Sequence, residues 1–238
     1  ELLQKASELF EEDDVTELQS AIDFASKMHH GQKRKSGEPY IIHPLSVAGI
    51  LIDWTMDIDT VIAGVLHDTV EDTETTLTEI ENMFGRDVAF LVDGVTKVSQ
   101  ARAGMRDLKS YLPSTRDNLT KLLIAVGEDV RVIIIKLADR LHNMQTLEYM
   151  SRDKQIKSAR ETQEVFAPLA DRLNMGRVRV QLEELAFSYL DPKEFKRLKK
   201  VMKDRLGRSH RRLAEVRHQV DARLTAERIE HHMDGRIK

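Results

Sequence analysis

The sequence of 238 residues contains no cysteine, few aromatic residues and no long hydrophobic run. Without cysteine, disulfides, thiolate metal sites and cysteine nucleophiles are excluded, so any metal must be held by His, Asp or Glu. Aromatic residues make up only 5%, and aliphatic patterns with helical spacing dominate, which favours an all-α core. No apolar run approaches the roughly 18 residues that span a bilayer, and the acidic start ELLQKASELFEEDD is unlike a signal peptide. We therefore expect a cytoplasmic protein without a membrane partner.

Charge is abundant but unevenly distributed. Charged residues make up 32% and hydrophobic residues 41% of the chain, which is typical of a soluble globular protein. Residues 193–238 contain 15 Lys and Arg against 7 Asp and Glu, although the whole chain has a net charge of −3. Such a basic segment can contact nucleic acid, an acidic partner or the acidic remainder of the chain. A solvated charged helix is the commoner explanation, and we expect no direct nucleic-acid partner.

The stretch GVLHDTVED, residues 64–72, ends an apolar helix in His67 and Asp68 and adds a carboxylate pair, Glu71 and Asp72. An imidazole nitrogen and a carboxylate oxygen make up half of a mixed set that suits a divalent first-row metal. Carboxylates about one helical turn further on can orient or deprotonate a metal-bound water. An isolated HD pair is usually a chance pair, and an ED pair is usually a solvated helix end. The interpretation therefore needs ligands from elsewhere.

Residues 31–44, GQKRKSGEPYIIHP, break the helical pattern with two glycines and two prolines, so we expect a loop. Within it Lys33, Arg34 and Lys35 stand beside Ser36, a cluster that suits a phosphorylated ligand, although short basic runs are often only surface. His43 follows at the junction with a predicted helix that Pro44 opens and that runs to about Asp53. A predicted apolar helix over residues 58–66 can bring His43 to His67. Taken alone, His43 would more often be a core or capping residue.

Residues 129–147, DVRVIIIKLADRLHNMQTL, contain an apolar run that would also suit a buried strand. Their length favours one long buried helix. On that helix Asp139, His142, Asn143 and Thr146 share one face, and a buried polar stripe needs partners. Either a site or an internal hydrogen-bond network explains such a stripe. We favour the site, because Asp139 supplies the missing fourth ligand.

The remaining pattern predicts helices at residues 2–10, 16–30, 77–84, 87–95, 117–126, two between 152 and 190, and a long charged helix from 193 to about 220. Thr16 is the predicted N-cap of the second, and Gly85 separates the fourth and fifth. Breaks are expected at residues 167–174 (APLADRLN) and at 191–192. Residues 96–113 are expected to form a weakly ordered connection, which is either a lid or a plain surface loop. His231 and His232 are expected to be incidental.

His43, His67 with Asp68, and Asp139 match the H…HD…D pattern of the HD superfamily of metal-dependent phosphohydrolases. Three segments closely resemble the N-terminal hydrolase domain of the RelA/SpoT (Rel) alarmone enzymes: HxGQxRKSGEPYxxHP (His29 or His30 to Pro44), HDTVED and KLADRLHNMQTL. The resemblance covers roughly residues 1–190 and implies an HD-type helical bundle there. Residues 191–238 would be an extended helical linker followed, at GRIK, by the truncated start of the synthetase domain.

The resemblance implies a manganese-dependent 3′-pyrophosphohydrolase that degrades ppGpp and pppGpp, the alarmones of the stringent response, to GDP or GTP and pyrophosphate. It places Mn²⁺ on His43, His67, Asp68 and Asp139, a set of two nitrogens and two hard oxygens. It assigns the attacking water to Glu71 and Asp72. The residues it implies for contact with the guanine nucleotide are Arg34, Lys35, Ser36, Arg140, Asn143 and Thr146.

Some members of that family have an inactive hydrolase domain that lacks the HD and ED residues, which are all present here, so we predict activity. Asp171, Asn174 and residues 115–118 depart from the family pattern, which affects the expected regulation more than the metal site. Two alternatives stay open. One is an HD phosphohydrolase acting on another nucleotide, and the other is a non-catalytic regulatory module that binds nucleotide or a partner.

Overall fold

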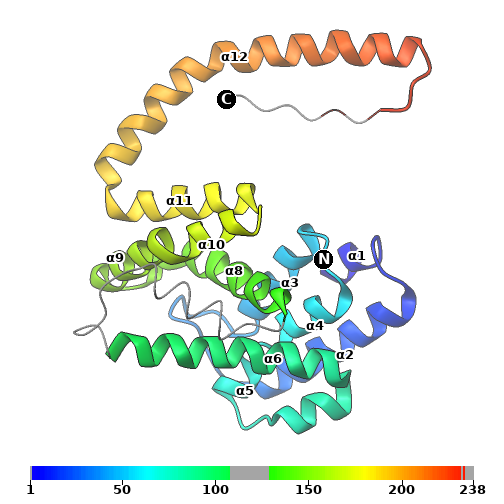
Figure 1. Cartoon of the computed structure of the whole chain (residues 1–238), viewed down its shortest axis with the longest axis vertical. Helices are drawn as coiled ribbons and strands as arrows, with labels where there is room; N and C mark the ends of the chain where they lie inside the picture. The colour runs from blue at the N-terminus through cyan, green and yellow to red at the C-terminus, as the bar shows by residue number, and fades with distance from the viewer. Residues whose placement is uncertain (1, 108–128, 232, 234–238) are drawn as a thin grey trace. The chain divides into compact units, whose positions relative to one another are not determined.

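The computed structural model describes residues 2–107, 129–231 and 233, and these residues form helices and turns without a β-sheet (Figure 1). The predicted all-α class is confirmed. By compactness the chain divides into two units, Glu1–Tyr189 and Leu190–Lys238. The domain boundary predicted at residues 190–191 stays a prediction. None of the described helices combines the length and the hydropathy of a transmembrane span.

The helices described in the first unit follow one another in sequence order. They are α1 (Leu2–Ala6), α2 (Glu12–Met28), α3 (Ile42–Asp53), α4 (Ile58–Leu66), α5 (Thr69–Asp72), α6 (Leu77–Asp107), α8 (Val130–Gln145), the 3₁₀-helix η1 (Leu147–Tyr149), α9 (Arg152–Glu161), the π-helix η2 (Thr162–Phe166), α10 (Ala167–Arg172) and α11 (Gly176–Leu190). The predicted helices at 58–66 and within 129–147 are confirmed.

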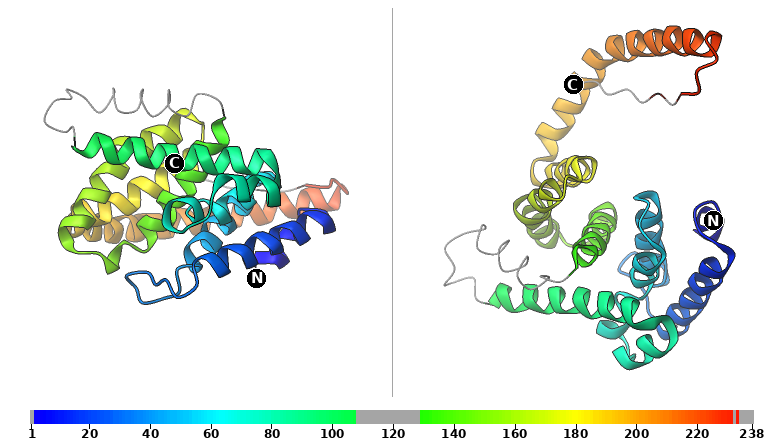
Figure 2. Two further views of the ribbon diagram at one scale, coloured as in Figure 1. Left: turned by 90° about the horizontal axis from the view of Figure 1, so that it is seen from below. Right: turned by 45° about the vertical axis from the view of Figure 1, so that its right-hand side comes forward.

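Helix α4 lies at the centre of the first unit. It packs against α2, α3, α6 and α8, and its residues from Thr60 to Leu66 are all buried. A helix that is apolar all round suits such a central position. Gly64 lets α3 approach closely, because a Cβ atom at this position would lie 2.4 Å from Leu51 Cδ1. The long helix α6 runs alongside α4 and α8 (Figure 2). The three helices that carry the predicted ligands are thus held in direct contact.

Helix α2 begins earlier than predicted. Its first residue is Glu12, and Thr16, the predicted N-cap, lies inside the helix, where its hydroxyl donates to the Glu12 carbonyl at 2.9 Å. The reason is electrostatic: the first turn carries Glu12, Asp13 and Asp14, and negative charge stabilises the positive end of the helix dipole. The predicted helix at 2–10 is shorter than expected and ends at Ala6.

Helix α6 corrects the prediction of a loop from residue 96. The backbone departs from helical geometry at Gly85, with φ 82°, as predicted, but the helix then continues to Asp107. Val95 and Val98 prolong its buried face, and straight-chain residues and alanine further on are good helix formers. The remainder of the predicted lid, residues 108–113, and the predicted helix at 117–126 lie outside the described residues.

The break predicted over APLADRLN is also wrong in its position. Residues Ala167–Arg172 form α10, with Pro168 in its first turn, where proline is tolerated. The chain turns only afterwards, at Asn174, whose φ of 57° is a conformation that asparagine adopts more readily than most residues. Asp171 contacts Arg179 at 3.3 Å. Both residues that depart from the family pattern therefore have local structural roles.

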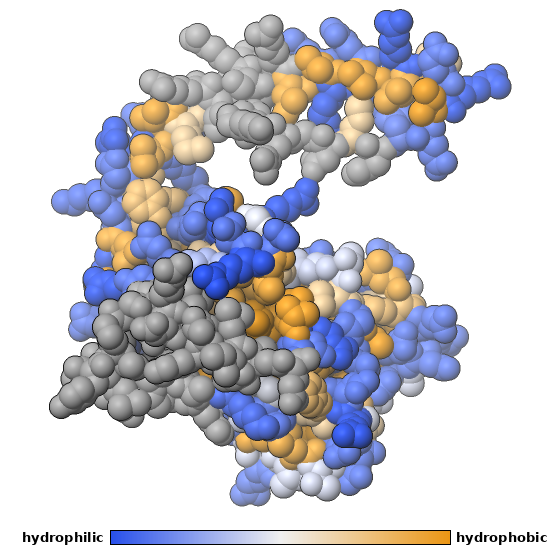
Figure 3. Space-filling model, viewed as in Figure 1, coloured by the Kyte–Doolittle hydropathy of each residue, from blue (hydrophilic) through white to orange (hydrophobic). Residues whose placement is uncertain are grey.

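The second unit is built on α12 (Pro192–Ala226), which starts at the predicted break and runs six residues beyond the predicted end near residue 220. Asp191 caps it by accepting from the Glu194 amide at 3.0 Å. In its described residues, hydrophilic side chains alternate with exposed apolar ones (Figure 3). His231 contacts Asp221 at 3.0 Å within this unit, and His232 lies outside the described residues.

Candidate metal and nucleotide site

Three helices bring potential metal ligands to one point. His43 is the second residue of α3, His67 is the C-cap of α4, and Asp139 lies in the middle of α8. Each offers one ligand atom, and the three atoms lie within 4.8 Å of one another. All three side chains are buried, with His67 fully inaccessible. Residues 43, 67 and 139 are thus far apart in sequence and adjacent in space, as the motif predicts.

Asp68 joins this group from the start of α5. Its carboxylate oxygens lie 3.6 Å from His43 Nε2 and 3.2 Å from His67 Nε2. Neighbouring residues on one continuous helix would diverge by about 100°. That divergence is avoided here because α4 ends at Leu66 and α5 begins at Thr69, so His67 and Asp68 lie at a helix junction.

The hydrogen bonds of His67 indicate which ring nitrogen is free to bind a metal. Its Nδ1 lies 2.8 Å from the Gly64 carbonyl, which can only accept, so Nδ1 carries a proton and donates. Nε2 faces Asp68 but is buried without a hydrogen-bond partner. In this buried site a positive charge between Nε2 and the facing carboxylate stabilises the pair, and either a proton on the ring or a metal ion can supply it. This arrangement fits a metal ligand.

Both acidic candidate ligands are held in their charged form. Burial alone would raise the pKa of each carboxyl, but the His67 ring keeps the pKa of Asp68 below its usual range, and Lys136 does the same for Asp139. Lys136 Nζ donates to Asp139 Oδ2 at 2.9 Å, and Asn143 donates to Oδ1. The deprotonated carboxylates are the form that coordinates a metal.

His142 supports His43 from behind, a role that the sequence pattern alone did not distinguish from the rest of the polar stripe. The two Nδ1 atoms lie 2.7 Å apart. Burial and the nearby His43 and Arg34 lower the pKa of His142 to about 4, so its ring is neutral at neutral pH. If His142 Nδ1 accepts this hydrogen bond, the proton is on His43 Nδ1. His43 Nε2 then has no proton and faces Asp68 and Asp139. A partner that sets the tautomer of a ligating histidine is common in metal sites.

Tyr40 links the ligand group to the acidic pair. Its hydroxyl lies 2.8 Å from Asp68 Oδ2 and 2.9 Å from Asp72 Oδ2. The ring stacks on His29 at 4.7 Å between centroids, and Gln32 donates to the Asp72 carbonyl at 3.1 Å. All three residues belong to the motif HxGQxRKSGEPYxxHP, but their residue types alone indicated no role for them. The available signal was a tyrosine three residues before a candidate ligand.

The predicted catalytic residues Glu71 and Asp72 lie at the end of α5 and line a pocket of about 650 Å³. The pocket also contains His43, Asp68 and Asp139 in its wall. The structure therefore brings the acidic pair to the ligand group. Glu71 and Asp72 do not lie on a continuation of α4, on which they would be one turn above the candidate ligands. They lie on the separate short helix α5.

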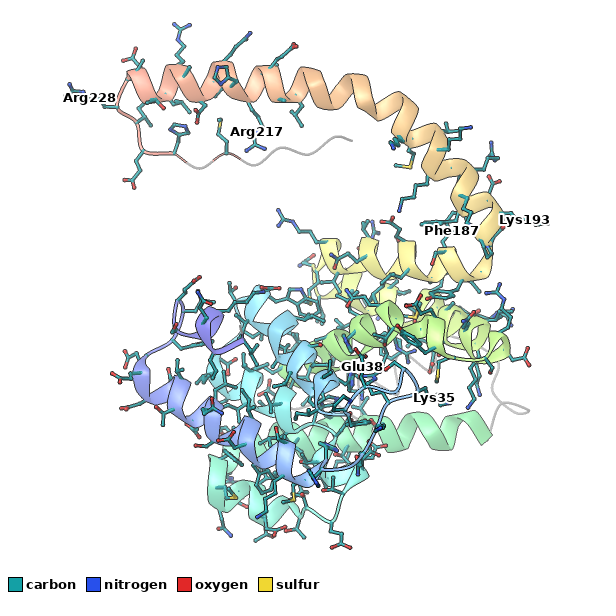
Figure 4. The ribbon with its side chains drawn as sticks, turned by 180° about the vertical axis from the view of Figure 1, so that it is seen from behind. Lys35, Glu38, Phe187, Lys193, Arg217 and Arg228 are labelled. Carbon is teal, nitrogen blue, oxygen red and sulfur yellow. The ribbon has the colours of Figure 1, made fainter. Side chains whose placement is uncertain are left out.

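The residues predicted to bind nucleotide lie in the same pocket, but with different environments. Arg34 reaches from the loop to α8, where it donates to Asn143 Oδ1 at 3.1 Å and to Thr146 Oγ1 at 3.4 Å. Lys35 and Ser36 line the pocket from the loop. Figure 4 labels Lys35 and Glu38 on this loop, which lies close to α8.

Arg140 has a mainly structural environment. It lies in the pocket wall, but its guanidinium contacts Glu161 at 3.1 Å and stacks on the Phe166 ring at 4.0 Å. It is only 4% exposed, so these contacts bind α8 to α9 and η2. Direct contact of Arg140 with a nucleotide stays a prediction.

The chain is similar to the model of one protein family and to several named proteins. The model of the HD domain family matches residues 21–176. A protein of Myxococcus xanthus named GTP pyrophosphokinase is 40% identical over 225 residues, which are 94% of this chain and 30% of that protein. The bifunctional (p)ppGpp synthase/hydrolase SpoT of Escherichia coli K12 is 40% identical over 227 residues, 95% of this chain and 32% of that protein.

A probable guanosine-3′,5′-bis(diphosphate) 3′-pyrophosphohydrolase of Synechocystis is 43% identical over 219 residues, 92% of this chain and 28% of that protein. A solved structure, described as a metazoan ortholog of SpoT that hydrolyses ppGpp and plays a role in starvation responses, is 26% identical with a TM-score of 0.53. The match covers 71% of this chain and 93% of the chain in that structure. The chain spans about a third or less of the curated relatives' length. The chain belongs to the HD domain family, and its resemblance to the RelA/SpoT hydrolase domain is confirmed.

Proposed function

We propose that the chain is a manganese-dependent 3′-pyrophosphohydrolase that degrades ppGpp and pppGpp to GDP or GTP and pyrophosphate. One observation carries the proposal: four ligand side chains from three parts of the chain meet beside an acidic pair in a pocket whose other wall is basic. Sequence similarity to named ppGpp hydrolases supports the substrate. The proposal includes a guanine nucleotide as the partner molecule and the cytoplasm as the location.

In this proposal, His43, His67, Asp68 and Asp139 hold the metal. A divalent metal bound there would supply Lewis acidity and lower the pKa of a water molecule. Two nitrogens and two carboxylates suit Mn²⁺, among other divalent metals. The other steps fall to the chain's own side chains, which position the nucleotide and move a proton.

Asp72, oriented by the Tyr40 hydroxyl, takes the proton of the attacking water, with Glu71 beside it. The water oxygen bonds to the phosphorus as the bond between that phosphorus and the ribose 3′-oxygen breaks. The proton that Asp72 took from the water passes to the 3′-oxygen, which leaves a 3′-hydroxyl and free pyrophosphate. Arg34 can stack on the base or pair with a phosphate, and Asn143 and Thr146 hold it in place. The pocket volume of about 650 Å³ lies in the range of nucleotide-sized ligand sites.

The deciding experiment combines elemental analysis of protein purified without chelator with ppGpp turnover in the presence and absence of Mn²⁺. We expect a bound divalent metal and pyrophosphate release that stops on chelation. His67→Ala and Asp72→Asn should each reduce kcat by about 10³-fold or more, the scale of losing a group used in the transition state. His218→Ala, at an exposed position on α12, is the control. No turnover with metal bound would contradict the proposal.

The two alternatives predict other results. An HD phosphohydrolase of different specificity would leave ppGpp intact and release phosphate or pyrophosphate from another member of a nucleotide panel. A non-catalytic module would bind nucleotide without turnover and would contain no metal. The complete set of ligands and the buried, unpartnered His67 Nε2 count against the second alternative.

A further inference from the structure

Four exposed lysines, Lys33, Lys35, Lys154 and Lys157, line the pocket in addition to Arg34. Lys33 and Lys35 come from the loop between α2 and α3, and Lys154 and Lys157 come from α9. Among the described ion pairs, none joins any of these lysines to a carboxylate. Lys35 and Lys154 are within hydrogen-bonding reach of each other, and this contact lowers the pKa of Lys35. Two ammonium groups this close repel each other unless an anion lies between them.

The contacts of α9 place Lys154 and Lys157 away from the metal ligands. Near the end of α9, Glu161 contacts Arg140, which follows the ligand Asp139 on α8. Near its start, Gln155 donates to the carbonyls of Glu148 and Met150, which follow α8. The two helices therefore run in opposite directions along the pocket.

Lys154, Lys157 and Glu161 fall on one face of α9, since they are spaced three and four residues apart. Lys154 and Glu161 are seven residues apart, a rise of about 10 Å on an α-helix. Lys154 thus lies about two turns further from the ligand group than Glu161 does. The pocket has an acidic, metal-binding end and a lysine-rich end, with Arg34, Asn143 and Thr146 also lining it.

We propose that Lys35, Lys154 and Lys157 form a second anion subsite, which binds the 5′-polyphosphate of the nucleotide while its 3′-pyrophosphate lies at the metal ligands. This assignment rests on the proposed function, because it needs a nucleoside with phosphate groups on both sides. Lysine is a flexible point charge, so an exposed lysine cluster accepts a diphosphate or a triphosphate equally well. The subsite thereby favours doubly phosphorylated nucleotides without distinguishing ppGpp from pppGpp.

The test compares ppGpp with guanosine 3′-diphosphate, which lacks the 5′ group. The double variant Lys154→Gln/Lys157→Gln removes two charges, and Arg160→Gln, an exposed position on α9 that does not line the pocket, is the matched control. We expect the ratio of kcat/KM for the two substrates to fall about tenfold in the double variant, through KM, and to be unchanged in the control. Added salt should erode the preference of the wild type more than that of the double variant. An unchanged ratio would overturn the subsite.

A binding experiment separates failure of this subsite from failure of the proposed function. Calorimetric titration of the metal-free chain with GDP requires no hydrolysis and probes the 5′-diphosphate alone. We expect GDP to bind about tenfold more weakly to the double variant than to the wild type or Arg160→Gln. Equal affinities, or no binding to the wild type, would overturn the subsite. If the wild type hydrolyses neither nucleotide but GDP binding weakens as expected, the anion subsite stands and the reaction must be reassigned.

Discussion

At the scale of single residues, the site depends on pairing buried polar atoms that would otherwise be costly. An unpaired buried charge destabilises a fold by several kcal/mol, and the buried carboxylates of this site have partners. Lys136 balances Asp139, and the Gly64 carbonyl accepts from His67. Tyr40 serves both Asp68 and Asp72 with one hydroxyl. These partners set the direction in which each ligand atom points, which residue type alone does not.

Replacing Tyr40 by Phe should slow the reaction without removing the metal. The Tyr40 hydroxyl links Asp68 to Asp72, so its loss frees Asp72 from its position beside the candidate ligands, while His29 still stacks on the ring. We expect kcat for ppGpp to fall about 10- to 100-fold, the range of a lost general-base contribution, with KM within about twofold. Steady-state kinetics at saturating Mn²⁺ measure both.

Tyr189→Phe is the control for this prediction, because Tyr189 is not among the residues that line the pocket. Elemental analysis of both variants checks that metal content is retained. A rise in KM with unchanged kcat would mean that Tyr40 contacts the substrate rather than Asp72 in the reaction. Loss of the metal from Tyr40→Phe would mean that the hydrogen bond from the Tyr40 hydroxyl to Asp68 is needed for metal binding.

At the scale of secondary structure elements, two local features position His67 at the end of α4. The first is the N-cap of α4. Asp57 accepts from the Thr60 amide at 3.1 Å and from its hydroxyl at 2.7 Å, and Arg131 on α8 donates to it at 3.2 Å. The cap therefore fixes the start of the central helix and ties it to α8.

Asp57→Ala should lower the free energy of unfolding by about 1 kcal/mol, the usual cost of losing such a cap. Burial would raise the pKa of Asp57, but its bonds to Thr60 and Arg131 outweigh this, and the pKa lies below its ordinary value of 3.8. The ionised cap then stabilises the fold above about pH 4, and the contribution is lost as pH falls through the lower folded value.

Urea unfolding at several pH values tests this directly. The difference in the free energy of unfolding between the wild type and Asp57→Ala should be constant from pH 5 to 8 and should shrink below pH 4. The control is Asp53→Ala, which removes an exposed ion pair with Lys5 and should cost less than about 1 kcal/mol. A difference that grows on acidification would contradict the sign of the pKa shift.

The second feature is the close packing of α3 on α4 at Gly64. A methyl group there would meet Leu51 Cδ1 at 2.4 Å, so Gly64→Ala forces the helices that carry His43 and His67 apart. We expect a loss of about 1–3 kcal/mol in the free energy of unfolding, as for other overpacked cores, together with weaker Mn²⁺ binding. Thermal unfolding and metal titration measure the two effects.

Gly49→Ala is the matched control for this substitution. Gly49 lies in α3, where an added Cβ would be 3.7 Å from Leu2 Cδ1, an ordinary contact. Alanine in a helix interior is favoured over glycine by about 1 kcal/mol, so Gly49→Ala should be neutral or stabilising. Equal destabilisation by both substitutions would show that the close packing at Gly64 has no special role in the stability of the fold.

At the scale of the whole molecule, all described ligand, acidic and pocket residues belong to the unit Glu1–Tyr189. The core cluster also lies within that unit, between Ala6 and Leu182. The second unit contributes a long charged helix whose described side chains are mostly exposed. The site therefore needs no described residue from the second unit.

A chain that ends at residue 190 should fold and retain the proposed activity. We expect its kcat/KM for ppGpp and its metal content to lie within about twofold of those of the full chain, since no described site residue is removed. Circular dichroism and ppGpp turnover measure the outcome. A soluble, folded but inactive fragment would show that residues 191–238 take part in the site.

The sequence by itself determined the helical class and which residues are the candidate metal ligands. Apolar spacing of 3.6 residues predicts α4 and α8, and the chemistry of His43, His67, Asp68 and Asp139 predicts a mixed nitrogen and oxygen site, because both are local properties of residue type. The boundaries of α2, α6 and α10 were misplaced, because helix ends depend on the dipole and on packing that continues beyond the clearest pattern.

Only the tertiary structure decided which atoms of that set face one another and what supports them. The Tyr40 bridge, the His142 contact and the pairing of Lys35 with Lys154 join segments between 28 and 119 residues apart. Periodicity carries no information about such contacts, since they arise when α3, α4 and α8 pack at the distances that Gly64 and its neighbours permit. Residue type determines the chemistry of a side chain, and packing determines which atoms it contacts.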